Sequence, residues 1–108
     1  MLRFSYEQLT LLSLTVLGWF VKRGEAADSV HVPRLRGEPL EPAALTHRYL
    51  AQRNASITAN DVQCSCPTEV LAAAAVLRPL GAAQLVASSA GILVSRHEAL
   101  SGILRATT

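Results

Sequence analysis

The 108-residue sequence has few of the side chains from which sites of known chemistry are built. It holds two cysteines and three histidines, and their spacing does not match that of a structural zinc site. Paired carboxylates, a serine or cysteine nucleophile motif and a glycine-rich phosphate loop are all missing. We therefore expect no catalytic activity, no metal and no cofactor.

Aromatic residues and charge of one sign are also scarce. The chain has two phenylalanines, two tyrosines and one tryptophan, whereas half of it is apolar and much of that is alanine and leucine. Ten basic and eight acidic residues are interspersed, with no polybasic run to bind nucleic acid or anionic lipid. This composition predicts an all-α fold, a small bundle of four to five helices in a single domain, residues 1–108.

The most apolar stretch, residues 1–24, predicts a helix. Ser5 and Gln8 have the spacing of a capping box, and Gly24 provides a stop. Because apolar side chains occur nearly all round this helix, four modest helices would leave part of it uncovered. We therefore predict an interface helix, shared in a homodimer or with another partner, whose contacts are made by Leu9, Leu12, Val16, Trp19 and Phe20. The alternative is the central helix of a monomeric bundle.

Two targeting alternatives concern the same stretch. A membrane span needs about 20 apolar residues, whereas the apolar run 9–21 is shorter and interrupted. A secretory signal would begin at Arg3 and be cleaved after Ala26, which makes a secreted helical protein without residues 1–26 an alternative. Glu7 and the basic pair that follows the run argue against it, so we expect a cytoplasmic protein that does not contact membranes.

The rest of the chain divides into a connection and a bundle. Residues 25–42 are charged and contain several prolines, so they predict a connection with at most a short edge strand at Val30, Val32 and Leu35. Residues 43–108 are expected to form the bundle. Its helices are predicted at 43–54, 67–78, 80–90 and 96–106, with a polar loop at 57–66.

The last two of these helices are predicted to form a hairpin, residues 80–106, that turns at Gly91. A capping box at Ser95 and Glu98 would open its second helix. Such a hairpin could be a DNA-binding helix-turn-helix, offering Ser95, Arg96, His97, Ser101 and Arg105 to DNA. With two fixed positive charges and a long turn, an ordinary helical hairpin is the preferred interpretation.

Cys64 and Cys66 are separated by a single serine. A disulfide between residues two apart is expected to be strained, and an intracellular location would keep both thiols reduced. We interpret the pair as two small residues before a helix.

Three segments resemble one known family: YLAQR at 49–53, TEV at 68–70 and AQLVASSAGILV at 83–94. They are similar to the FlhD family of flagellar transcriptional co-regulators, over about half of the chain and with gaps. The resemblance implies a small, helical, dimeric and cytoplasmic protein that works with a partner subunit carrying much of the DNA contact. The apolar first helix has no counterpart there, and the resemblance assigns no functional residue.

Together these observations predict a small dimeric adaptor that regulates transcription by contacting a transcription factor, with nucleic acid reached only indirectly. It would act as an antiactivator or a co-activator, and a bacterial quorum-sensing receptor is one candidate target. The alternatives are a direct DNA-binding helix-turn-helix repressor and the secreted helical protein. The sequence does not specify the partner, the sign of regulation or the oligomer size.

Overall fold

The central element of the fold is α1 (Tyr6–Lys22). Its predicted cap is confirmed, because the Ser5 hydroxyl accepts a hydrogen bond from the backbone N–H of Gln8 and the Gln8 side chain accepts one from the backbone N–H of Ser5. At the other end Gly24 has a positive φ of 74°, a conformation that glycine adopts without strain. The computed structural model describes residues 2–25, 32–52, 55–80 and 82–107.

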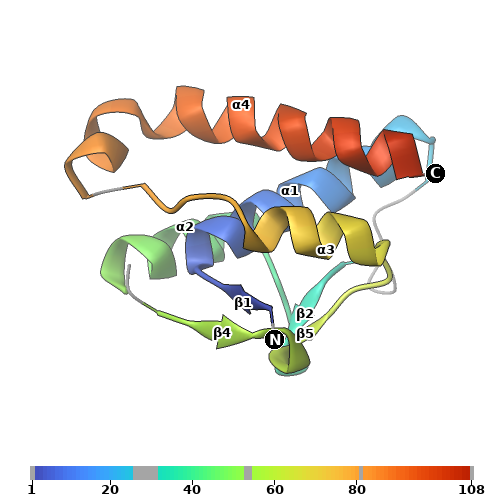
Figure 1. Ribbon diagram of the computed structural model, residues 1–108, viewed down its shortest axis with the longest axis horizontal. Coiled ribbons are helices and arrows are strands. Elements are labelled where there is room, and N and C mark those ends of the chain that lie inside the picture. The colour runs from blue at the N-terminus through green and yellow to red at the C-terminus, as the bar shows by residue number, and fades with distance from the viewer. Residues whose placement is uncertain (1, 26–31, 53–54, 81, 108) are drawn as a thin grey trace.

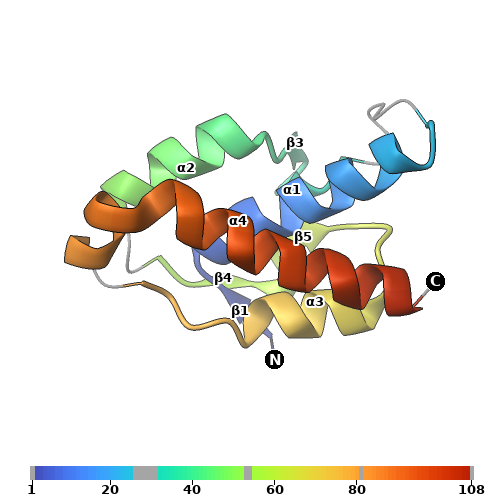
Figure 2. The ribbon, with the colours of Figure 1, turned by 90° about the horizontal axis from the view of Figure 1, so that it is seen from above.

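Three further helices pack around α1. Figure 2 shows α1 between α2 (Pro42–Ala51) and α3 (Thr68–Ala75), with α4 (Ala82–Thr107) crossing above it. The proline at the start of α2 occupies the first turn, where its missing N–H costs no helical hydrogen bond. On the opposite side of α1, short strands complete the cover (Figure 1).

The chain encloses α1 with its own elements. Leu9, Leu11 and Leu12 have no exposed surface, and Val16 is only 1% exposed. These side chains pack with apolar residues from all three other helices and from the strand segments, among them Leu45, Val70, Leu100 and Leu35. The structure therefore agrees with the alternative to an interface helix, in which α1 is the central helix of a single chain.

The prediction of an all-α fold is wrong, because the structure also contains two small antiparallel sheets. In the first, β1 (Arg3–Phe4) pairs with β4 (Ile57–Thr58). In the second, β2 (Arg34–Leu35) lies between β3 (Glu38–Pro39) and β5 (Val62–Gln63). Each strand has only two residues, which is too short for an alternating pattern to be visible in the sequence.

β2 and β3 lie in the segment predicted to be a connection, β4 and β5 lie in the predicted polar loop, and β1 lies in the segment predicted to be the first helix. Of the predicted edge strand at Val30, Val32 and Leu35, only Leu35 lies in a strand, and that strand, β2, is the middle one of its sheet; Val30 lies outside the described residues. The hairpin between β2 and β3 turns at Arg36 and Gly37, both with positive φ, as tight hairpin turns require. Pro39 lies on the edge strand, where its missing N–H breaks no ladder.

The predicted hairpin at 80–106 is also wrong. Residues 82–107 form one continuous helix, α4, that passes through Gly91 without a turn. A glycine inside a helix costs only about 1 kcal/mol relative to alanine, so it does not have to end the helix. Ser95 and Glu98, which were predicted to cap a second helix, instead lie within α4. Leu100 and Leu104 on its inner side are buried against α1.

The enclosure of α1 can be tested by two alanine substitutions on the same helix. Leu12→Ala removes a fully buried side chain and should lower the free energy of unfolding by about 2–5 kcal/mol. Val21→Ala, at a position that is 64% exposed, should change it by about 0.5 kcal/mol or less. Urea unfolding followed by circular dichroism measures both, and equal effects would contradict the enclosure.

Candidate binding site beside Trp19

A buried ion pair joins the start of α1 to α4. One carboxylate oxygen of Glu7 accepts a hydrogen bond from Arg96 Nη1 at 2.8 Å, and the other accepts one from the backbone N–H of Leu80 at 3.0 Å. The Glu7 side chain has no exposed surface, and that of Arg96 is 19% exposed. Arg96 also donates to the carbonyl oxygen of Arg78. Because every one of these partners belongs to the fold, we assign this network a structural role.

The neighbouring Gln8 has a similar role at the end of α3. Its side-chain amide donates to the carbonyl oxygens of Ala75, at 3.2 Å, and Leu77. Carbonyl groups at the end of a helix lack hydrogen-bond donors within that helix, and the Gln8 amide supplies one of the missing donors. The first turn of α1 thus holds both α3 and α4 in place.

The residues predicted for DNA contact do not form one recognition surface. Arg96 is engaged by Glu7, whereas His97, Ser101 and Arg105 line a hollow against α1. His97 is half-buried there, with Nδ1 at 3.1 Å from the hydroxyl of Thr15. Since residues 82–107 are a single helix, the two-helix arrangement on which the DNA-binding alternative depends is not formed.

The residues predicted for a protein interface divide into two groups. Leu9, Leu12 and Val16 are buried by the chain itself, so they have no surface to offer a partner. Trp19 is half-buried and Phe20 is 9% exposed, and their rings make an edge-to-face contact with centroids 4.8 Å apart. Of the five predicted interface residues, only Trp19 and Phe20, at this end of α1, keep exposed surface for a partner.

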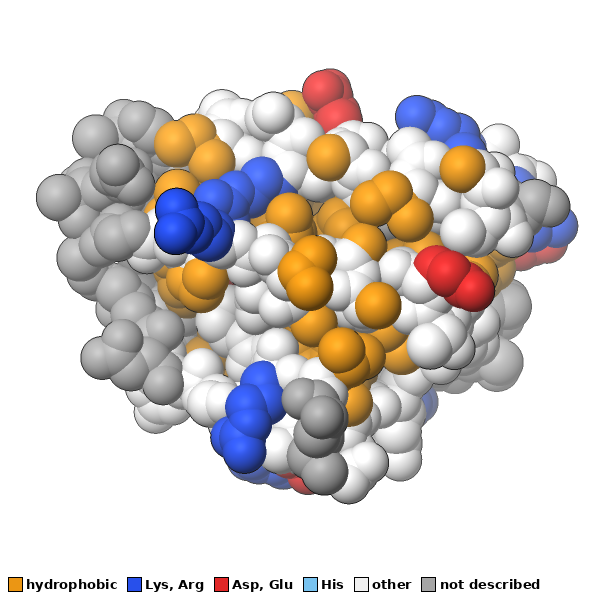
Figure 3. All heavy atoms as spheres, viewed as in Figure 1, with side chains coloured by type: hydrophobic (Ala, Val, Ile, Leu, Met, Phe, Trp, Pro, Cys, Tyr) orange, Lys and Arg blue, Asp and Glu red, His pale blue; other side chains and the backbone are white. Residues whose placement is uncertain are grey.

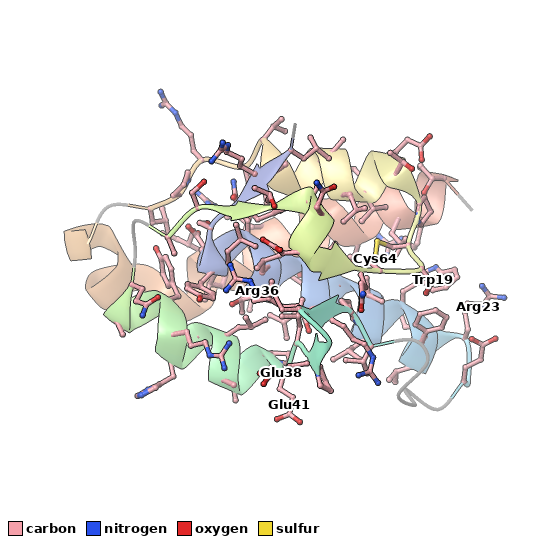
Figure 4. All side chains as sticks on the ribbon, turned by 90° about the horizontal axis from the view of Figure 1, so that it is seen from below. Trp19, Arg23, Arg36, Glu38, Glu41 and Cys64 are labelled. Carbon is pink, nitrogen blue, oxygen red and sulfur yellow. A yellow bond between two sulfur atoms is a disulfide. The ribbon has the colours of Figure 1, made fainter. Side chains whose placement is uncertain are left out.

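An apolar cavity of about 220 Å³, which we call the Trp19 pocket, opens at this end of α1. Its lining comes from three parts of the chain: Val16, Trp19 and Phe20 of α1, residues 65–67 of the loop before α3, and Leu104 of α4. Figure 4 shows Trp19 near the cysteine-containing loop, with Arg23 farther out. A concave apolar site with aromatic walls is the usual form of a binding pocket.

Basic side chains surround the outer side of Trp19. The guanidinium of Arg23 lies over the indole ring, 4.3 Å from its centroid. A smaller hollow of about 40 Å³ on the α4 side of Trp19 is lined by Lys22, His97 and Arg105, among others. Arg23 also contacts the carboxylate of Glu25 at 3.9 Å, and both side chains are about half exposed. The surroundings of the pocket are therefore positively charged overall.

The cysteine pair was interpreted wrongly. The structure joins Cys64 and Cys66 by a disulfide, with their Cα atoms 5.3 Å apart, inside the range that bridged cysteines normally span. The chain bends at Cys66, and the backbone N–H of Cys66 donates to Cys64 Sγ at 3.2 Å. Cys66 also lines the Trp19 pocket, and no local pattern in the sequence predicts this placement.

The environment of His97 lowers its pKa below the ordinary value of 6.5. Desolvation by burial is the main cause, and the positive charge of Lys22 acts in the same direction, whereas Glu98 opposes the shift. Thr15 donates its hydroxyl hydrogen to the Leu11 carbonyl oxygen, so its own oxygen can accept a hydrogen bond from Nδ1–H of neutral His97.

A larger hollow of about 530 Å³ lies between β1 and residues 75–79. It is shallow and open to solvent, and its buried polar side chains, Ser5 and Gln8, are already hydrogen-bonded within the fold. We therefore favour the smaller Trp19 pocket as the binding site.

Comparison with known proteins gives no relative. No family model, no curated protein and no solved structure matches this chain. Among the described residues, no group of three or more histidine, cysteine or acidic side chains is placed to hold a metal ion. The helices in that part of the chain include none that could cross a membrane. The resemblance to the FlhD family stays a prediction.

Removing one partner of the buried Glu7–Arg96 ion pair should greatly lower the free energy of unfolding. Arg96→Ala leaves a buried carboxylate without its cation and should destabilise the protein by about 3–5 kcal/mol in chemical unfolding. The double variant Glu7→Gln with Arg96→Met removes both charges. Its free energy of unfolding should lie between that of Arg96→Ala and that of the wild-type protein. A change below about 1 kcal/mol in Arg96→Ala would show that the pair is solvated.

The lowered pKa of His97 predicts that the free energy of unfolding depends on pH. Because its pKa is lower in the folded protein than in the unfolded chain, the unfolded chain binds the proton more readily. Stability should therefore fall as the pH is lowered from 7 through 6.5, and the fall should level off once the folded protein is also protonated. His97→Gln should weaken this dependence in parallel unfolding curves, and identical pH profiles would contradict the assignment.

Proposed function

We propose that this protein is a small adaptor that regulates transcription by binding a transcription factor, and that the Trp19 pocket receives an apolar side chain of that factor. The observation that supports this most is the convergence of α1, α4 and the loop before α3 on one apolar cavity. Tryptophan beside a pocket is typical of the residues that dominate binding energy in protein interfaces. The transcription factor as partner comes from the FlhD resemblance.

The charge around the pocket indicates the chemistry of the partner segment. Lys22 and Arg23 follow Trp19 along α1, and Arg105 lies on the neighbouring part of α4. An apolar side chain flanked by carboxylates would combine burial in the pocket with attraction to this rim. We therefore propose an acidic and apolar segment as the occupant.

The predicted homodimer would need a surface other than the buried part of α1. Figure 3 shows apolar side chains gathered where α3 lies beside α4. Val76 and Ile103 are exposed large apolar residues of these two segments, at 79% and 37%. We propose this face for self-association, which leaves the Trp19 pocket for the transcription factor.

Affinity purification with the wild-type protein and two variants tests the proposed function. Wild-type protein and the control Val94→Ala, which changes an exposed apolar residue outside the pocket, should retain the same transcription factor from the source cell. Trp19→Ala should retain at least about tenfold less of it, because the pocket loses its main aromatic wall. The loss should be reproduced with the two purified proteins.

Two outcomes would contradict the proposal. The first is that no DNA-binding regulator depends on Trp19 for its retention. The second is that a regulator is retained equally by wild-type protein and Trp19→Ala, while circular dichroism shows the variant to be folded.

A further inference from the structure

The disulfide at the edge of the Trp19 pocket contributes little to holding the fold together. It links residues separated only by Ser65, so it constrains the unfolded chain far less than a bridge that closes a long loop. It also joins two positions in the same loop, between β5 and α3, and does not connect distant elements. Both cysteines are half-buried, so neither is sealed inside the core. Stabilisation of the fold therefore does not account for the Cys64–Cys66 bridge.

The position of Cys66 suits exchange with another protein's thiols. Its side chain lines the same cavity as Trp19 and Phe20, so a segment bound in the pocket would lie beside the bridge. Cys66 also precedes α3 by two residues, and the positive end of a helix favours a thiolate over a thiol. A reactive disulfide needs such access for an attacking sulfur and an environment that accepts the sulfur it releases.

We propose that the Cys64–Cys66 bridge is a redox-active site that oxidises a pair of thiols in a protein segment bound in the Trp19 pocket. This proposal rests on the proposed function, because it uses the same pocket to hold the segment. The substrate class is a dithiol peptide with apolar side chains and carboxylates near its cysteines. Each bridge oxidises one substrate dithiol in a single turnover.

The reaction balances without a further reagent. A substrate thiolate attacks Cys66 Sγ, forming a mixed disulfide and releasing Cys64 as a thiolate. The second substrate thiolate then attacks the substrate sulfur of the mixed disulfide, which forms the substrate disulfide and releases the Cys66 thiolate. Two electrons pass from the substrate to the bridge, and the two protons lost by the substrate thiols can protonate Cys64 and Cys66.

The test uses the oxidised full chain and two reduced synthetic peptides. Both peptides carry two cysteines separated by two residues; one has leucine and glutamate around them, and the other has glycine and serine. Mass spectrometry follows the peptide disulfide and the two thiols gained by the protein. We expect the leucine peptide to be oxidised at least about tenfold faster, and Trp19→Ala to reduce its rate to that of the glycine peptide.

Dithiothreitol serves as the control for the bridge itself. It is too small to need the pocket, so Trp19→Ala and wild-type protein should be reduced by it at the same rate. Equal oxidation rates for the two peptides with wild-type protein, or a bridge that neither peptide reduces, would overturn the proposal.

Single-cysteine variants test which sulfur is attacked. With a single-cysteine version of the leucine peptide activated as a pyridyl disulfide, Cys64→Ser should form a mixed disulfide through Cys66 at least about tenfold faster than Cys66→Ser forms one through Cys64. The opposite order would contradict the assignment of Cys66. Circular dichroism of both variants checks that they are folded.

A cysteine-free version of the leucine peptide separates this proposal from the proposed function. Its binding, followed by the fluorescence of Trp19, depends only on the pocket. Binding without oxidation of the dithiol peptide would overturn the redox proposal and leave the adaptor proposal standing. Absence of binding, together with equal oxidation rates for both dithiol peptides, would overturn both.

Discussion

The burial of α1 is the constraint on which the rest of the structure depends. An apolar helix must be covered on every side, and the other helices and the strand segments are arranged to do this. The polar breaks in α1 help to attach the cover. The hydroxyl of Ser13 donates to the Leu40 carbonyl oxygen at 2.6 Å, and Glu7 binds Arg96 of α4. These bonds satisfy polar groups that burial would otherwise leave without partners.

Local signals predicted much of the helical structure, whereas long-range contacts were not predictable from one sequence. The capping box of α1 and the prolines at the starts of α2 and α3 placed the starts of these helices within a few residues, because capping depends on neighbouring side chains. The strands depend on pairing partners far along the chain, as Arg3 does on Thr58. The break predicted at Gly91 failed because packing of α4 on α1 outweighs the weak helix propensity of one glycine.

The candidate site was predictable in part. Trp19 and Phe20 were identified as anchors because they are large and aromatic, and they do line a pocket, whereas Leu9, Leu12 and Val16 are buried. Amphipathic pattern alone cannot distinguish a central helix from an interface helix, since both are apolar nearly all round. Glu7 carried an unused signal, because a carboxylate in the first turn of a buried helix needs a cation, which came from 89 residues away. The disulfide depends on the bend at Cys66, which the spacing of the two cysteines does not reveal.

Hydrogen exchange of the α1 amides tests most directly whether the helix is enclosed by its own chain. If it is, the amides of Leu12 and Val16 should exchange only through global unfolding, with protection equal to the free energy of unfolding and the same at low and high protein concentration. If a second chain covers α1, protection should rise with protein concentration, because association would then supply part of it. Rapid exchange of these amides in dilute monomeric protein would contradict the account.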